Sequence, residues 1–245
     1  MKRYTTNQEI ENLCEAMIKD FFKQRHYTNV LCVDIESFVR EYLGIPVVFE
    51  KFAENGSGVL GFISDGEKPL IVVDGTEKKS VVFPARTVVI EQYLNQPQES
   101  ARKRFTIAHE GAHEMLSRHI PIQSSFKAAY HTEFDKEGVY PTETLKEMLS
   151  VNECLANRTA ACFLMPRFLI ERVLKRYNNA EPVIIYDGNV LSQHSKLLIQ
   201  RMANAMGVSY SAFFNRLKEL NMFDYRPIAD YLHYDLKMGG DCYEQ

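Results

Sequence analysis

Two histidines and a glutamate stand at a spacing that can build a metal site. Residues 109–113 read His-Glu-Gly-Ala-His. In a helix, residues four apart lie on the same face, so the imidazoles of His109 and His113 can converge on one metal ion. Glu110, one step round the helix, can lie beside the water that such an ion activates and accept its proton. The spacing predicts a catalytic metal centre; an ordinary amphipathic helix with two histidines is the alternative.

The segment around this pentapeptide has the features of a helix. Ser100 is a candidate N-cap, Pro97 precedes it, and no proline interrupts the run that follows. Apolar residues recur at helical spacing at Phe105, Ala108, Ala112 and Leu116. We therefore expect the two histidines to project from one face of this helix.

A third ligand is predicted downstream, because catalytic zinc usually takes three protein ligands. A second helix is expected from about residue 143 to 165, ended by Pro166. In it Glu153 and Asn157 are four apart and share a face. Glu153 can give a carboxylate oxygen to the metal, and Asn157 can hydrogen-bond the non-ligating ring nitrogen of a histidine. A surface glutamate is the alternative. Three small residues would let this helix pack closely on the first: Ala156, Ala160 and Ala161.

The ligand set predicted from these patterns is His109, His113 and Glu153, with Glu110 as the catalytic base. Two histidines and a glutamate suit Zn²⁺, although Mn²⁺ or Fe²⁺ can occupy the same ligands.

These motifs resemble those of the ImmA/IrrE family of zinc metallopeptidases. The resemblance covers most of the chain from about residue 10 to 225 and is densest in the middle third. It rests on three core motifs, Arg104–His113, Glu153–Asn157 and Leu164–Pro166, and on flanking segments 42–48, 58–61, 206–209 and 216–220.

The resemblance implies a cytoplasmic endopeptidase that cleaves a helix-turn-helix transcriptional repressor and so relieves repression, under stress or in a mobile element. Three positions depart from the family pattern. Ala112 stands where a glycine is common, Leu155 where a second glutamate is frequent, and Thr159 where a phenylalanine is frequent. None of the three is an assigned metal ligand, so they bear on substrate handling more than on metal binding.

Composition narrows the class of protein. The chain has 245 residues, 45% of them apolar and 25% charged, which is typical of a soluble globular protein. It lacks an apolar run long enough to span a membrane, and its N-terminus is too polar for a signal peptide. We expect a cytoplasmic protein without a membrane partner. The five cysteines form no CxxC pair and are expected to be reduced thiols.

The C-terminal third has the outline of a helix-turn-helix. Helices are expected over residues 192–205 and 209–220, with Gly207 as the turn residue. The stretch is locally basic, but the chain's net charge of −3 provides no general attraction for nucleic acid. Four residues of the second helix predict a buried face: Phe213, Phe214, Leu217 and Leu220. We therefore expect packing or docking of a protein partner instead of direct DNA binding; the sequence sets no oligomeric state.

The order of elements predicts an α+β fold: a helical, zincin-like metallopeptidase core with a small β-sheet and a C-terminal helix-turn-helix-like segment. Helices are expected over 8–23 and 34–43, and strands over 47–52, 59–63 and 70–73. Residues 81–90 are β-rich but broken by Pro84. We expect a metallopeptidase domain over 1–180 and a helical subdomain over 181–245 packed on it.

Residues 117–142 show no periodicity, and long segments of this kind are often functional. A lid that supplies a tyrosine or histidine donor to the developing oxyanion is expected there, with no residue assigned.

Two functions of different classes follow. The first is a zinc-dependent endopeptidase whose substrate is a helix-turn-helix repressor. The alternative is a catalytically silent or partner-activated regulatory protein that binds a repressor or DNA.

Overall fold

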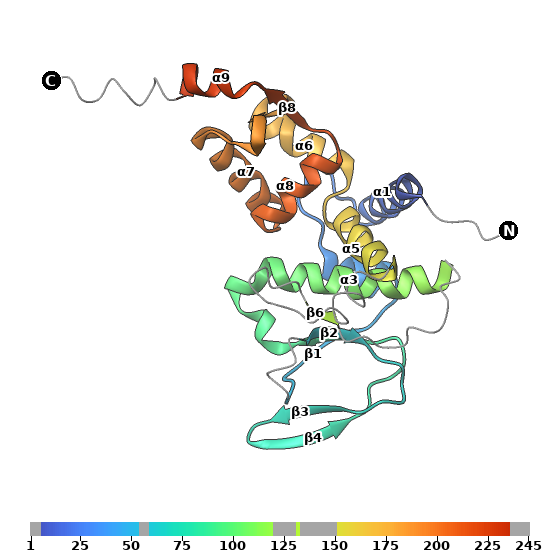
Figure 1. Ribbon diagram of the computed structural model, residues 1–245. Coiled ribbons are helices and arrows are strands. Elements are labelled where there is room, and N and C mark those ends of the chain that lie inside the picture. The colour runs from blue at the N-terminus through green and yellow to red at the C-terminus, as the bar shows by residue number, and fades with distance from the viewer. Residues whose placement is uncertain (1–5, 54–58, 120–130, 133–150, 236–245) are drawn as a thin grey trace. The chain divides into compact units, whose positions relative to one another are not determined.

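The computed structural model describes residues 6–53, 59–119, 131–132 and 151–235, and the chain forms two compact units, Met1–Pro166 and Arg167–Gln245 (Figure 1). The predicted α+β class is confirmed. The division falls at Pro166, whereas the predicted boundary lay at residue 180, because helix α6 (Arg167–Asn178) belongs to the second unit. The packing of the second unit on the first stays a prediction.

The first unit begins with helix α1 (Asn7–Gln24), close to the predicted bounds. A capping box starts it, since the Thr6 side chain accepts from the Glu9 backbone N–H and the Glu9 side chain accepts from that of Thr6. The predicted helix over 34–43 forms as α2 (Ile35–Ser37) followed by a π-helical turn, η1 (Phe38–Tyr42).

An aromatic cluster joins these helices to α5 (Val151–Leu164). The Phe38 ring lies 5.4 Å from that of Phe21 on α1 and 4.9 Å from that of Phe163 on α5, between ring centroids. Residues 143–150, where the α5 helix was also expected, lie outside the described residues. Edge-to-face contacts of this kind add to the burial of the rings, so the cluster fixes α5 against the N-terminal helices.

A four-stranded sheet has the order β1-β5-β2-β6. Its strands are β1 (Val47–Glu50), β5 (Val88–Glu91), β2 (Val59–Ile63) and β6 (His131–Thr132). β1 pairs with β5 in parallel, and β2 is antiparallel to both β5 and β6. All four residues of β5 are buried, as expected for the central strand of a sheet covered on both faces.

A hairpin of β3 (Leu70–Asp74) and β4 (Glu77–Val81) lies on the side of the sheet away from α3 (Figure 1). Four buried residues form a small core there: Phe52, Val72, Phe83 and Val89. The predicted β-rich segment 81–90 is interrupted around Pro84, as expected: residues 82–87 are a loop between β4, which ends at Val81, and β5, which begins at Val88. Four of the five residues of β4 are exposed, so it lacks the apolar alternation that predicts a strand.

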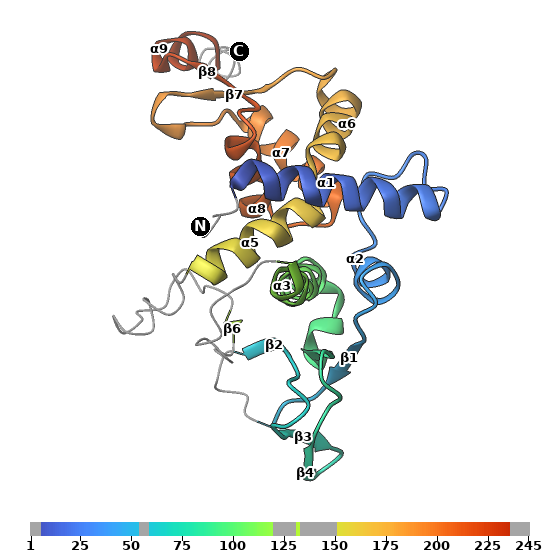
Figure 2. The ribbon, with the colours of Figure 1, turned by 90° about the vertical axis from the view of Figure 1, so that its right-hand side faces the viewer.

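Helix α3 (Ser100–His119) is the centre of the first unit and confirms the predicted motif helix. Two 3₁₀ turns lead into it, η2 (Gln92–Asn95) and η3 (Pro97–Glu99). From Thr106 to Leu116 every residue except His113 is buried. Figure 2 shows α3 nearly end-on, between the helices α1 and α5 and the sheet.

The second unit contains the two predicted C-terminal helices, α7 (Gln193–Met206) and α8 (Tyr210–Glu219). Ser192 and Ser209 are their N-caps, and Gly207 ends α7 with a φ of 64°, in the left-handed region that favours glycine. Of the four residues predicted to form a buried face, Phe213, Leu217 and Leu220 are buried, whereas Phe214 is half-buried. Further elements, not predicted, are α6, the parallel strands β7 (Val183–Tyr186) and β8 (Phe223–Arg226), the turn η4 (Asp187–Asn189), α9 (Ile228–Asp230) and η5 (Tyr231–Asp235).

The described part of the chain contains no disulfide, and its cysteines are Cys14, Cys32, Cys154 and Cys162. Burial raises the pKa of the Cys32 thiol above its usual value, with a smaller opposing effect from Arg104. This keeps Cys32 in its unreactive protonated form at neutral pH.

A close approach between β2 and α3 sets the distance of the motif helix from the sheet. A Cβ atom at Gly61 would lie 2.8 Å from Cγ2 of Thr106, 2.9 Å from Cδ1 of Ile90 and 3.2 Å from the carbonyl oxygen of Val89. One of these atoms belongs to a side chain of α3, and the other two belong to a side chain and the backbone of β5. Only glycine fits at residue 61 without moving α3 away from β2.

Gly61→Ala is therefore expected to lower the free energy of unfolding by about 1–3 kcal/mol, the usual cost of overpacking. Gly111→Ala, at the other close approach of α3, is the comparison and should cost less. Its Cβ would meet chiefly one methyl of Val39, at 2.9 Å, and alanine gains about 1 kcal/mol of helix propensity over glycine. Urea denaturation of the two variants measures the difference. Equal losses of unfolding free energy in the two variants would show that β2 and α3 can move apart without cost.

Candidate metal centre

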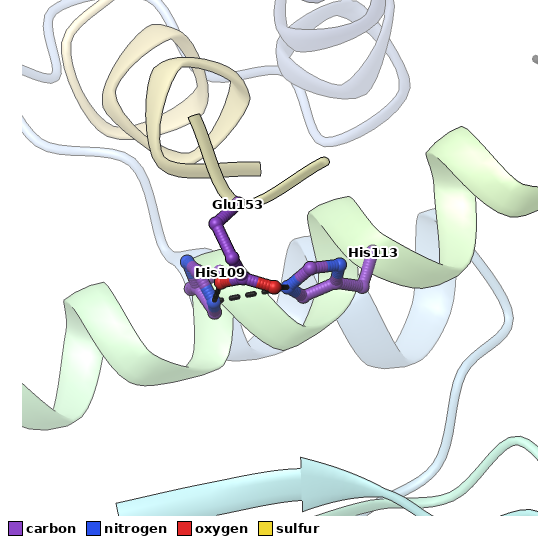
Figure 3. A group of neighbouring side chains, drawn as sticks. All are labelled: His109, His113 and Glu153. Atoms are coloured by element: carbon purple, nitrogen blue, oxygen red, sulfur yellow. Dashed lines mark hydrogen bonds and ion pairs between the residues drawn. The ribbon is translucent and has the colours of Figure 1, made fainter. Parts of the chain in front are cut away.

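The structure brings the three predicted ligands together. His109 and His113 project from α3, and Glu153 comes from the first turn of α5 (Figure 3). Each residue offers one ligand atom, and these atoms lie within 4.8 Å of one another. Helix α5 therefore completes a site that α3 begins.

The distances between the donor atoms fit one metal ion. Nε2 of His109 lies 3.0 Å from Nε2 of His113. The carboxylate of Glu153 lies 3.4 Å from each of the two, through Oε2 to His109 and Oε1 to His113. Ligands about 2.0–2.2 Å from a tetrahedral zinc ion are separated by roughly 3.3–3.6 Å. The two distances to Glu153 fall in this range and the distance between the histidine nitrogens is slightly below it, so the donor set and the spacing suit a single metal ion such as zinc.

The ligands are mostly withdrawn from solvent. The exposed fraction of the side chain is 8% for His109, 12% for Glu153 and 18% for His113. Interactions between charges are stronger in such a recess than in water. His113 and Glu153 are the more exposed of the three ligands.

Glu110 is buried, with 2% of its surface exposed. It lies four residues after Thr106, which contacts β2 at Gly61, and residues four apart share a helix face. Glu110 therefore lies on the face of α3 that meets β2, next along the chain to His109. This position suits a proton acceptor beside the metal ligands, and its role as catalytic base stays a prediction.

Two other predicted contributors have different outcomes. Asn157 is exposed on α5, while Nδ1 of His109 is buried, and the hydrogen bond between Asn157 and a histidine stays a prediction. The lid expected over residues 117–142 falls mainly outside the described residues. Of that stretch the structure describes only the end of α3 and the short strand β6.

Contacts on the side of α3 facing α2 and η1 hold the motif helix in place. Arg104 donates from Nη2 to the carbonyl oxygen of Val33, at 2.8 Å, just before α2. A Cβ atom at Gly111 would lie 2.9 Å from Cγ2 of Val39 on η1. Both residues stand in or beside the sequence motif, and the structure gives each a role in seating the helix.

A charged cluster next to the ligands was not predicted from the sequence. The side chain of Glu114 is 9% exposed, and its Oε1 accepts from Nε of Arg86, at 2.6 Å, and from Nε of Arg118, at 2.8 Å. The spacing of Glu114 and Arg118 is a recognisable signal, because it matches a helical ion pair. Nothing in the local sequence marks Arg86, which reaches α3 from the β4–β5 loop.

A helix bearing His-Glu-x-x-His and a glutamate from a second helix are arranged as the metal ligands of a metallopeptidase are. The family model for the IrrE N-terminal-like domain, Peptidase_M78, matches residues 40–218, more than half of the chain. The chain belongs to this family, which supports a role related to metallopeptidases.

A comparison with curated proteins finds no match. Among solved structures, the chain is similar to a Mycobacterium tuberculosis transcriptional regulator, at 16% identity and a TM-score of 0.41. The similarity covers 86% of this chain and 46% of the regulator, so the chain spans about half the length of that protein. None of the helices in the described part of the chain is long and apolar enough to cross a membrane.

Metal binding is expected to depend on all three ligands. The unmodified protein should take up one Zn²⁺ per chain and melt at a higher temperature with the metal, since a ligand that binds the folded state stabilises it. His113→Ala and Glu153→Gln should each weaken zinc affinity by about a hundredfold or more, beyond the 10–100-fold effect of residues that only support ligands. Calorimetric titration with zinc measures the zinc dissociation constant of each protein.

His194→Ala is the control, because His194 is an exposed histidine on α7 in the second unit. It should leave the affinity unchanged. Equal binding by all four proteins would place the zinc elsewhere.

Proposed function

We propose that this protein is a zinc-dependent endopeptidase that cleaves a helix-turn-helix transcriptional repressor and thereby relieves repression. The convergence of His109, His113 and Glu153 on one point, with Glu110 buried beside them, is the observation that carries the peptidase part. The repressor as substrate rests on membership of the family.

The residues divide the chemistry between them. His109, His113 and Glu153 would hold the ion, which supplies a Lewis acid and lowers the pKa of a bound water to about 7. The carboxylate of Glu110 accepts the proton of the attacking water and passes it to the nitrogen of the leaving amine, acting as base and then as acid. The low exposure of the ligands excludes bulk water from this step.

The second helix of the helix-turn-helix-like pair favours a protein partner over DNA. Arg216 on α8 is 1% exposed and donates from Nη1 to Oε2 of Glu219, at 3.0 Å. The ammonium group of Lys218 lies 5.5 Å from the ring centroid of Phe214. Phosphate binding needs arginines and lysines at the surface, and a buried Arg216 cannot serve. We propose that this unit contributes to binding the repressor.

Replacement of the base tests the mechanism. Glu110→Gln should bind zinc normally but cleave about 10²–10⁴-fold more slowly, the usual contribution of a general acid–base group. The measurement is intact-mass spectrometry of a helix-turn-helix repressor encoded beside this gene, incubated with zinc-loaded protein. A single cut by the unmodified protein, strongly reduced in Glu110→Gln, is the expected result.

Glu171→Gln is the matched control, because Glu171 is exposed on α6, and it should cleave at the normal rate. Near-normal cleavage by Glu110→Gln would contradict the assignment of Glu110 as the catalytic base. Absence of any cut, with the repressor still bound, would favour the alternative of a regulatory binding protein that is silent or needs an activating partner.

A further inference from the structure

The cluster around Glu114 carries a net positive charge at the surface. One buried carboxylate pairs with two guanidinium groups, so the three side chains sum to +1. The exposed fraction is 9% for the Glu114 side chain, 56% for Arg86 and 34% for Arg118. The carboxylate of Glu114 is therefore shielded from solvent, while both guanidinium groups are exposed to solvent.

Arg86 is held in place by an ordered loop. Its φ of 66° is in the left-handed region, which is rare for residues other than glycine, and such conformations persist where the surroundings enforce them. Its backbone N–H donates to the carbonyl oxygen of Ser64, at 2.7 Å. Ser64 in turn donates from its backbone N–H to the carbonyl oxygen of Thr87 and from Oγ to that of Phe83, both at 2.8 Å. The loop thus aims Arg86 at α3.

The cluster lies beside the metal ligands. Thr106 contacts β2 at Gly61, and Glu114 pairs with Arg86, whose backbone bonds to Ser64 just after β2. Helix α3 and strand β2 therefore run side by side, as Figure 1 also shows. Glu110 lies between these two contacts along the helix. The arginines are thus about one helical turn, roughly 5–6 Å along the axis, beyond the proposed base.

We propose that Arg86 and Arg118 form an anion subsite that binds a carboxylate of the peptide substrate and directs cleavage to a bond near an acidic residue. This inference rests on the proposed peptidase function. The contact with Glu114 uses Nε of each arginine, and the terminal Nη donors are those that pair with a carboxylate in a fork. Glu114 holds the two like charges close together. An acidic side chain and a free C-terminal carboxylate share this chemistry.

A peptide library tests the subsite. Zinc-loaded protein is incubated with short peptides of randomised sequence, blocked at both ends, and the new N-termini are sequenced. Asp and Glu should be enriched at one fixed position from the cut. Arg86→Gln and Arg118→Gln should each reduce the enrichment by about tenfold, the effect of losing a charge-assisted hydrogen bond. Arg102→Gln is the control, because Arg102 pairs with Glu99 at the other end of α3, and should keep it.

Peptides with a free C-terminus separate the two sources of the carboxylate. Cuts at a fixed distance from the free end, without enrichment of Asp or Glu in blocked peptides, would assign the subsite to the terminal carboxylate. Arg86→Lys keeps the charge but not the fork, and should lose most of the preference while remaining folded. An acidic preference that survives unchanged in Arg86→Lys and Arg118→Gln would overturn the proposal.

Binding without turnover separates this proposal from the peptidase function. Fluorescence anisotropy with Glu110→Gln protein compares a labelled acidic peptide, taken from the selected set or from the repressor, with its Glu→Gln counterpart. The acidic peptide should bind about tenfold more tightly, and Arg86→Lys should remove the difference. Equal binding of the two peptides would contradict the subsite. Acid-selective binding through Arg86, with no peptide cut by the zinc-loaded protein, would keep the subsite and reject the peptidase function.

Discussion

The meeting of α3 and α5 at three polar side chains is the constraint on which the first unit depends. Two imidazoles and a carboxylate lie within hydrogen-bonding or near-contact distance of one another in a poorly solvated place. Burying such groups costs free energy unless each is paired or bound to a metal. A divalent ion would satisfy all three at once, and metal affinity would then be coupled to the stability of the α3–α5 contact. The same ion that serves chemistry would also hold the two helices together.

The surroundings of α3 explain how a helix with so many polar residues can be central. Arg104 ties it to the segment before α2, and the two glycines let neighbouring elements approach closely, Gly61 on β2 and Gly111 against η1. The geometry of the donor atoms depends on these contacts, because a shift of α3 would change both distances from its histidines to Glu153 on α5. Positioning is therefore spread over α2, η1 and β2 as well as the motif residues.

Much of the site could be predicted from the sequence because it is local. The four-residue spacings at 109–113 and 153–157 follow the periodicity of a helix. In the second unit, the helix caps at Ser192, Gly207 and Ser209 are short-range signals of the same kind. Contacts between distant segments carry no such signal. Arg86 reaches Glu114 from another element, β4 is a polar strand made by pairing with β3, and α6 joins the second unit through packing. Periodicity cannot predict these, since tertiary contacts decide them.

Charge on α3 links the proposed base to the arginine cluster. Glu110 and Glu114 lie one turn apart on one face, where two like charges destabilise a helix. Both are buried, which strengthens the repulsion. Arg86 and Arg118 each pair with Glu114, so their positive charges offset this repulsion. A carboxylate of the substrate bound to the same guanidiniums would be drawn from solution to a point one turn from Glu110. The arginines thereby connect the charge balance of the helix to the choice of substrate.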